Sequence, residues 1–233
     1  MIKDQKKQIV INLPSWGGFF STMRILFVHQ NFPGQYSKLL PSAVKVHGHQ
    51  CIALKLNKAK QQTQKTEIFP GLQLIEYPIF RGNTNGIHPW ALETESKIIR
   101  GEACAAAAHQ LKTEGFTPDL ICAHPGWGEA LFLKTIWPEV PMLCYQEFFY
   151  QSHGFDLDFD PEFQPILEWK DQARTITKNA YLHLTQEQSS WNLTPTQFQR
   201  SSFPSQWQQS ISVIHDGINT QQAAPADQPI DLK

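Results

Sequence analysis

The sequence predicts an α/β fold with a doubly wound, Rossmann-like parallel sheet, and two observations support this. Short apolar segments such as 24–30 (RILFVHQ) and 119–123 (DLICA) lack polar alternation, which is typical of strands buried on both faces of a parallel sheet. These segments alternate with segments of helical spacing, which predicts right-handed βαβ units. The 233 residues are enough for one large domain.

The N-terminal half contains four predicted strands and three predicted helices. Apolar runs place strands at residues 24–30, 51–56, 72–79 and 119–123. Helices are expected at 36–47, at the Ala-rich segment 90–114, and in a short segment that ends at 136. Gly48 ends the first helix, and Pro41 falls early within it. The Lys- and Gln-rich segment 57–66 is expected to form a mobile loop.

The C-terminal half continues the alternation. Strands are expected at residues 142–146, 181–185 and 211–214. Helices are expected at 161–179, which Pro161 opens, and at 187–201. We expect residues 23–220 to form one domain, with a disordered extension at 1–22 and a disordered tail at 221–233.

Composition and charge exclude several classes of protein. The 20 basic and 21 acidic residues nearly cancel, so the charge balance does not favour a nucleic-acid partner. The four cysteines form no C-x-x-C pair, and we expect buried free thiols in a reducing compartment. No apolar stretch reaches the roughly 18–20 residues that span a bilayer, and the N-terminus lacks a secretory signal. These features predict a cytoplasmic protein.

Most residues with useful chemistry follow the predicted strands. In doubly wound sheets, ligands bind beyond the carboxyl ends of the strands, where the strand order reverses. The loops at 30–35, 124–129, 147–160 and 215–219 all follow predicted strands. We therefore expect them to gather on one rim of the sheet.

The loop at 124–129 (HPGWGE) is the strongest candidate for a binding site. His124 can share a proton near neutral pH, and Trp127 can stack on a sugar ring. Gly126 and Gly128 flank this tryptophan at a strand-to-helix turn. Glu129 is either a further ligand contact or a helix cap that the helix dipole favours.

The loop after the first strand is a second candidate. It consists of Asn31, Phe32, Pro33, Gly34 and Gln35. Its glycine lets a ligand approach the backbone closely, although a tight turn without a ligand would use the same residue. There is no G-x-G-x-x-G motif and no acidic residue at the end of the second strand, so the dinucleotide-binding fingerprint is absent.

Glu147 follows the fifth predicted strand, at the same rim as the 124–129 loop. Its carboxylate could accept hydrogen bonds from sugar hydroxyls or act as a base. Asp156, Asp158 and Asp160 alternate as in a calcium loop. The glycine and the closing glutamate of such a loop are missing, so we predict no metal site. Motifs of serine hydrolases, zinc proteases and P-loop NTPases are also absent.

Six segments resemble the N-terminal domain of family 4 glycosyltransferases, most closely a bacterial subgroup. They are MRILFVHQNFPGQ (23–35), PDLICAHPGWGEALFLK (118–134), YQEFFY (145–150), FDPEF (159–163), LTPTQFQRSSFP (193–204) and VIHDGIN (213–219). The resemblance covers about residues 23–220. It implies one half of a GT-B architecture, in which two Rossmann-like domains face a cleft.

The resemblance also implies an activity and roles for residues. The enzyme transfers a sugar from a nucleotide-sugar donor to a glycan or lipid-linked acceptor, retains the anomeric configuration, and uses neither a metal nor another cofactor. By motif match, His124 would lie near the reacting sugar, and Glu147 would face the cleft. The loop from Asn31 to Gln35 would lie near the donor phosphates and the acceptor. In our leading hypothesis, Trp127 stacks on the acceptor ring. A lipid-linked acceptor would place the protein at the inner membrane face.

The chain departs from the family pattern at its C-terminal end. His215, Asp216 and Gly217 match the segment that leads into a second, donor-binding domain, and that domain does not follow in this sequence. The sequence therefore predicts an incomplete transferase, or one half of a split enzyme whose partner chain carries the donor domain. A non-catalytic module for sugar binding or partner docking is the alternative.

Overall fold

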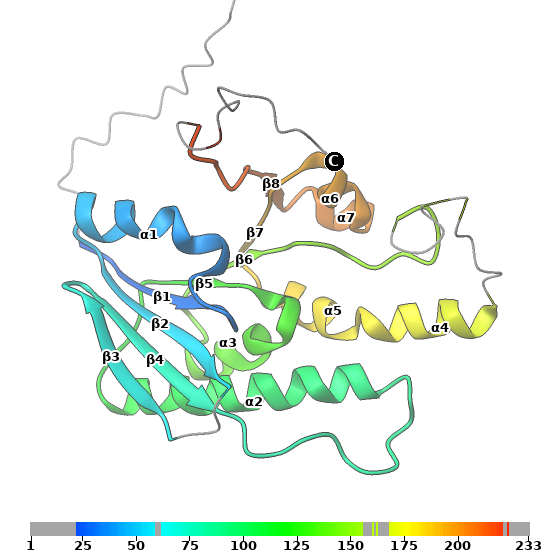
Figure 1. Cartoon of the computed structure of the whole chain (residues 1–233), viewed down its shortest axis with the longest axis horizontal. Coiled ribbons are helices and arrows are strands. Elements are labelled where there is room, and N and C mark those ends of the chain that lie inside the picture. The colour runs from blue at the N-terminus through cyan, green and yellow to red at the C-terminus, as the bar shows by residue number, and fades with distance from the viewer. Residues whose placement is uncertain are drawn as a thin grey trace, which may run out of the picture.

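The computed structural model describes residues 22–58, 62–155, 160, 162, 168–220 and 223. The strands are β1 (Arg24–Val28), β2 (Gln50–Asn57), β3 (Gln64–Phe69), β4 (Leu72–Pro78), β5 (Leu120–Ala123), β6 (Met142–Tyr145), β7 (Trp191–Thr194) and β8 (Ile211–Val213). They form one sheet in the order β3-β4-β2-β1-β5-β6-β7-β8 (Figure 1). All neighbouring pairs are parallel except β3 with β4, which confirms the doubly wound α/β fold.

Helices and helical turns connect the strands. They are η1 (Gly34–Ser37), α1 (Leu39–Pro41), η2 (Ser42–Val46), α2 (Leu92–Thr113), η3 (Pro125–Trp127), η4 (Glu129–Phe132), α3 (Leu133–Ile136), α4 (Trp169–Lys178), α5 (Ala180–Gln186), α6 (Gln197–Ser202) and α7 (Ser205–Gln208). The extension and tail expected at the two ends lie outside the described residues, apart from residues 22 and 223.

The strand order reverses next to β1, and this reversal positions the rim loops. β1 pairs with β2 on one side and with β5 on the other, so Ile25 lies between Cys51 and Leu120. The chain leaves β1 toward one face of the sheet and leaves β5 toward the other. A crevice at the carboxyl ends of these two strands follows from this topology.

Apolar side chains fill both faces of the sheet. On one face, η1, α1 and η2 pack on β1, β2 and β4 through residues such as Tyr36 and Leu40. On the other face, α2 and α3 pack through Cys104, Leu111 and Leu133 (Figure 1). The burial on both faces explains why the central strands are continuous apolar runs. The four cysteines are buried and unpaired, as predicted.

The polar segment at 57–66 is not entirely a loop, because its end belongs to a strand. β3 begins at Gln64 and pairs antiparallel with β4 at the edge of the sheet. Five of its six residues are exposed. An edge strand with little burial needs no apolar pattern. The polar composition of this segment therefore did not indicate a strand.

For residues 181–201 we expected a strand followed by a helix, and the structure shows a helix followed by a strand. The expected strand at 181–185 is the helix α5, which buries Tyr181, Leu182 and Thr185 at helical spacing. The strand of this region is β7, within the segment expected to be a helix. Its inward side chains Asn192 and Thr194 are buried although polar, so hydropathy alone did not reveal the strand.

Two predicted helices differ in their form. The helix expected at 36–47 is divided among η1, α1 and the π-helical turn η2. Pro41 has no N–H group, so the regular hydrogen-bond series cannot pass through it. The helix expected from Pro161 begins instead at Trp169, after the extended residue Glu168, whose side chain forms a capping box with Asp171. Pro161 itself lies outside the described residues.

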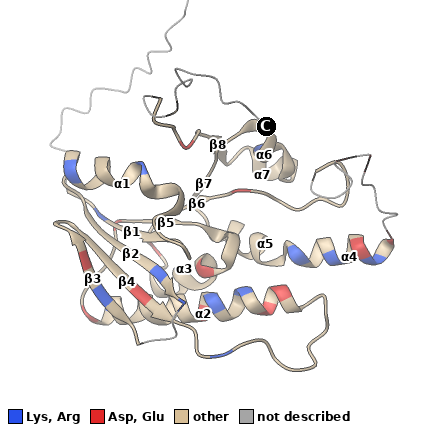
Figure 2. Cartoon of the chain, viewed as in Figure 1, with Lys and Arg blue, Asp and Glu red and all other residues tan. Residues whose placement is uncertain are grey.

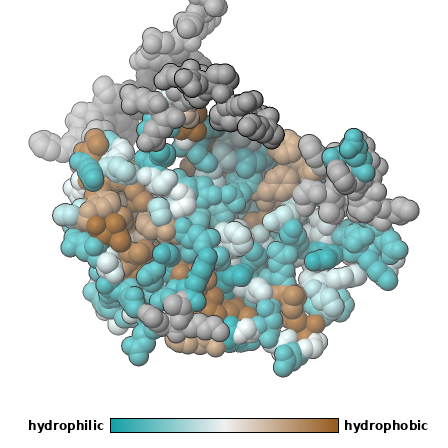
Figure 3. Space-filling view, viewed as in Figure 1, coloured by the Kyte–Doolittle hydropathy of each residue, from teal (hydrophilic) through white to brown (hydrophobic). Residues whose placement is uncertain are grey.

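The surface carries both signs of charge. Figure 2 shows basic and acidic residues interspersed on α2 and α4 rather than separated by sign. In Figure 3, polar residues occupy most of the centre of this face, and apolar residues gather on the side of α1. None of the helices in the described part of the chain combines the length and hydropathy of a membrane-spanning segment.

Candidate functional site

The rim loops enclose a cavity of about 450 Å³, called the main cavity below. It is lined by His29, Asn31, Gly34, Gln35, Ser37, Lys38, Trp127, Glu147, Asp216 and Gly217. These residues come from the loops after β1, β5, β6 and β8 and from η1. The expected gathering of the loops on one rim is therefore observed.

His124 and Glu147 form the polar centre of the site. Nε2 of the buried His124 lies 3.2 Å from Oε2 of Glu147, whose side chain is 46% exposed. Nε2 of Gln35 donates a hydrogen bond to the other carboxylate oxygen of Glu147, at 2.6 Å. The contact with His124 lowers the pKa of Glu147, and the Gln35 bond adds to this effect. Glu147 is therefore a fixed carboxylate at neutral pH.

A second histidine supports the first. His29 follows β1, and its ring contacts the edge of the His124 ring at a centroid distance of 4.9 Å. Burial, together with a smaller effect of the neighbouring His124, lowers the pKa of His29 to about 4. Nδ1 of His29 accepts a hydrogen bond from the backbone N–H of Asn31 at 2.9 Å. This neutral ring fixes the start of the 31–35 loop.

The glycines of the two loops make room for these histidine rings. A Cβ atom at Gly34 would lie 2.5 Å from the ring of His29, and one at Gly126 would lie 2.7 Å from the ring of His124. Gly34 also has a φ of +47°. The glycines are thus required for the packing of the site's own side chains.

Gly128 allows the HPGWGE loop to contact α2. Its φ is +102°, and a Cβ atom there would lie 2.3 Å from the carbonyl oxygen of Lys97. In the same contact, Nζ of Lys97 donates a hydrogen bond to the carbonyl oxygen of Gly126 at 2.8 Å. Lys97 therefore contacts the loop on both sides of Trp127, through its side chain at Gly126 and through its backbone at Gly128.

The segment after β8 is attached to the same centre. The hydroxyl group of Tyr145 donates a hydrogen bond of 2.5 Å to Asp216. The Tyr145 ring stacks on the ring of His124 at a centroid distance of 6.0 Å. The hydrogen bond from Tyr145 thus holds Asp216 near this centre, and Asp216 and Gly217 both line the main cavity.

Most of the predicted site residues line one of two neighbouring cavities, and the others do not. Asn31, Gly34, Gln35, Trp127, Glu147, Asp216 and Gly217 line the main cavity, and His124 and Gly126 line a neighbouring one. Phe32 points into the apolar core, and Glu129 is fully buried behind the loop. Pro33 and Gly128 line neither cavity, and His215 lines a separate cavity of about 400 Å³.

Sequence reasoning missed Lys38 and Lys97. Lys38 lines the main cavity one turn beyond the 31–35 loop, so extending that loop into the following helix would have found it. Lys97 lies 27 residues before His124 in sequence, on α2, and no local signal connects the two. Only the packing of α2 on the HPGWGE loop brings them together.

Two other findings concern the described residues outside this centre. No group of three or more His, Cys, Asp or Glu side chains there is arranged to hold a metal ion. Asp156 and Asp158 lie outside the described residues.

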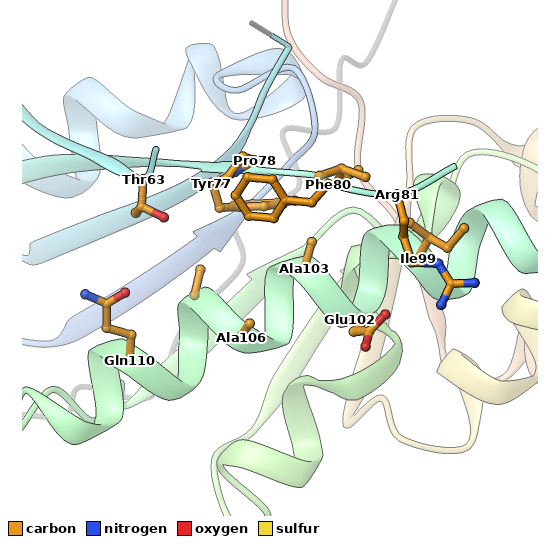
Figure 4. Close-up of a pocket in the computed structure, with 12 residues that line it drawn as sticks. Thr63, Tyr77, Pro78, Phe80, Arg81, Ile99, Glu102, Ala103, Ala106 and Gln110 are labelled. Carbon is orange, nitrogen blue, oxygen red and sulfur yellow. The ribbon is translucent and has the colours of Figure 1, made fainter. Parts of the chain in front are cut away.

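A further cavity of about 380 Å³ lies between the end of β4 and α2, where Tyr77 and Phe80 face Ala103 (Figure 4).

Comparisons with known proteins agree with this architecture. A family described as the glycosyl transferase family 4 group matches residues 47–223. No curated protein matches the chain. A structure of sucrose-phosphate synthase from Thermosynechococcus elongatus has a TM-score of 0.50 at 13% identity, covering 86% of this chain and 93% of that one.

A second structure is the catalytic domain of starch synthase IV from Arabidopsis thaliana, bound to ADP and acarbose. Its TM-score is 0.50 at 14% identity, and the match covers 90% of this chain and 54% of that one. The chain thus spans about half of that catalytic domain. Both structures show the same fold at low sequence identity.

Proposed function

Because the chain belongs to the glycosyl transferase family 4 group, we propose that it is the acceptor-side domain of an enzyme that transfers a sugar from a nucleotide-sugar donor to a glycan or lipid-linked acceptor. One observation supports the assignment of the site: the His124, Glu147 and Gln35 side chains are joined at the edge of the main cavity. A sugar hydroxyl placed there would meet the partly exposed carboxylate of Glu147, directly beside the imidazole of His124.

The pair His124 and Glu147 suits a hydroxyl that must lose its proton. A hydroxyl nucleophile becomes reactive when a positioned group accepts or shares its proton. Nε2 of His124 and Oε2 of Glu147 are 3.2 Å apart, so a hydroxyl bound to the partly exposed carboxylate lies next to the imidazole. We assign His124 to orienting the reacting hydroxyl and sharing its proton, and Glu147 to holding acceptor hydroxyls.

The main cavity also suits a donor. Lys38 lines it and adds a positive charge. This charge favours the diphosphate of a nucleotide sugar. Trp127 is 37% exposed at the border of the cavity and offers a ring face on which an acceptor sugar can stack.

The substitution His124→Ala tests this assignment. We expect transfer to fall by at least about 100-fold, the usual contribution of a positioned acid or base. Transfer of radiolabelled sugar from a panel of nucleotide sugars would be measured with this chain alone and with the products of the adjoining coding sequences added. NMR of the product anomer, and assays in EDTA, would test our further proposal of retention without a metal.

His109→Ala is the matched control, because His109 is an exposed histidine on α2, away from both cavities. It should leave transfer unchanged. Undiminished turnover in His124→Ala, or equal losses in both variants, would remove His124 from the reaction.

A further inference from the structure

A second cavity of about 250 Å³, called the side cavity below, adjoins the main one. It lies among α2, α4, α5 and the HPGWGE loop, and Trp127 and Glu147 line both cavities. Lys97 and Lys178 also line it. A ligand that contacts Trp127 can therefore occupy both cavities at once.

Lys97 is a buried cation with unused hydrogen-bonding capacity. Its residue is only 5% exposed. Within the described part of the chain, its ammonium donates one hydrogen bond, to the carbonyl oxygen of Gly126, although an ammonium group has three donors. The rings of Trp127 and Tyr181 lie 4.9 and 5.0 Å from Nζ. Aromatic faces hold a cation in place without neutralising its charge.

Lys178 presents a second cation to the same cavity. Its Nζ lies 3.4 Å from the centre of the Tyr150 ring. Among the described residues, it forms no ion pair with a carboxylate. Oγ1 of Thr94 on α2 donates a hydrogen bond to the carbonyl oxygen of Thr177, the residue before Lys178, at 3.2 Å. This bond holds the end of α4 against α2.

The acidic residues of the side cavity stand at its edges. Oε1 of Glu93 lies 3.9 Å from Nζ of Lys97, and its side chain is 40% exposed. Glu147 is bound to His124 and Gln35. Burial is the main cause of the lowered Lys97 pKa. The charges of Arg100 and Lys178 also lower this pKa, whereas those of Glu93 and Glu129 raise it. Two cations that repel each other in a cavity are stabilised when an anion binds between them.

We propose that the side cavity binds an anionic group of the acceptor, a phosphate or a carboxylate, between Lys97 and Lys178. This inference rests on the proposed function, because it assumes that Trp127 stacks on the acceptor ring. The ring would then present a hydroxyl to His124 and Glu147 and its anionic substituent to the two lysines. The acceptor class would be sugar phosphates or uronic acids rather than neutral sugars.

Direct binding tests the proposal without a donor and without transfer. Isothermal titration of the 233-residue chain would compare hexose 6-phosphates, hexuronates, the matched neutral hexoses and inorganic phosphate. We expect one of the two anionic sugar classes to bind at least about tenfold more tightly than its neutral counterpart, as hydrogen bonds to charged groups imply. The preferred class identifies the anion as phosphate or carboxylate.

Two variants locate the site. Lys178→Gln should remove most of the preference for the anionic sugar, because the half-buried Lys178 lines the cavity. Lys170→Gln, an exposed position on the same helix, changes the net charge equally and should keep the preference. Circular dichroism would check that both variants fold.

The other outcomes each overturn the inference. They are equal binding of anionic and neutral sugars, equal losses in the two variants, and binding of inorganic phosphate as tight as that of the best sugar. Failure of the proposed function is distinguishable, because it would appear as absent transfer in the nucleotide-sugar assay while the binding preference persists.

Discussion

Glu129 shows that the position of a residue in a loop does not determine the surroundings of its side chain. It belongs to the HPGWGE loop, yet its carboxyl group is fully buried behind the loop. Burial raises its pKa from 4.5 to about 7, although the charges of Arg100 and Lys97 act in the opposite direction. His124 and Glu147, by contrast, meet as the rim argument predicted. Side-chain direction within a turn depends on backbone conformation, which the sequence does not reveal.

The raised pKa of Glu129 predicts a pH-dependent stability. A carboxyl group with a raised pKa in the folded state contributes stability that is complete below pH 4.5 and is lost as the pH rises toward 7. Relative to wild type, Glu129→Gln should therefore gain roughly 2–3 kcal/mol in free energy of unfolding between pH 4.5 and pH 8. Urea unfolding of both proteins at these two pH values measures the difference. A difference that does not change with pH contradicts the burial of an ionisable Glu129.

Among elements, the turns at the strand ends decide the geometry of the site. β5 ends before His124, and η3 and η4 follow with Gly128 between them in the left-handed conformation. The sequence already placed the two glycines of this loop beside Trp127 at a predicted strand-to-helix turn. Their cause, close contact with α2 and with the histidine rings, became visible only when the elements were packed.

Gly128→Ala should destabilise the protein strongly. A Cβ atom there combines a φ of +102° with a distance of 2.3 Å to the Lys97 carbonyl oxygen. Gly115→Ala is the matched control, because its φ is +92° and no atom lies within 4 Å of the added Cβ. We expect a loss of roughly 1–2 kcal/mol for Gly115→Ala and at least about 3 kcal/mol for Gly128→Ala, measured by chemical denaturation. Equal losses would mean that α2 moves away from the loop without cost.

At the scale of the whole molecule, the sheet has a protected centre and open edges. β1 is paired on both sides and lies between the two apolar layers, whereas β3 is an exposed edge strand. An amide exchanges after its hydrogen bond breaks and its N–H group reaches solvent. The free energy of this local opening is higher in strands that are buried and paired on both sides. We predict that amides of β1 and β5 exchange with deuterium most slowly and those of β3 first, as mass spectrometry of peptide fragments would measure. Protection of β3 equal to that of β1 would show that the edge is covered in solution.

The fold class, the central strands and the rim on which the loops gather were predictable from the amino-acid sequence. Apolar runs without alternation have few alternatives to a sheet buried on both faces, so β1, β2, β4, β5 and β6 were predictable. β3 was not predictable, because an edge strand has no apolar pattern, and neither was β7, because Asn192 and Thr194 are polar and buried.

Which side chains share a cavity depends on how the elements pack. Lys97 and Lys178 lie on helices far apart in sequence, and both line the side cavity because the end of α4 lies against α2. The adjacency of β1 and β5 likewise brings His29 against His124. Local patterns reflect the environment of each residue along its own element. The distances between elements depend on how their surfaces pack, and the candidate site consists of side chains from several elements.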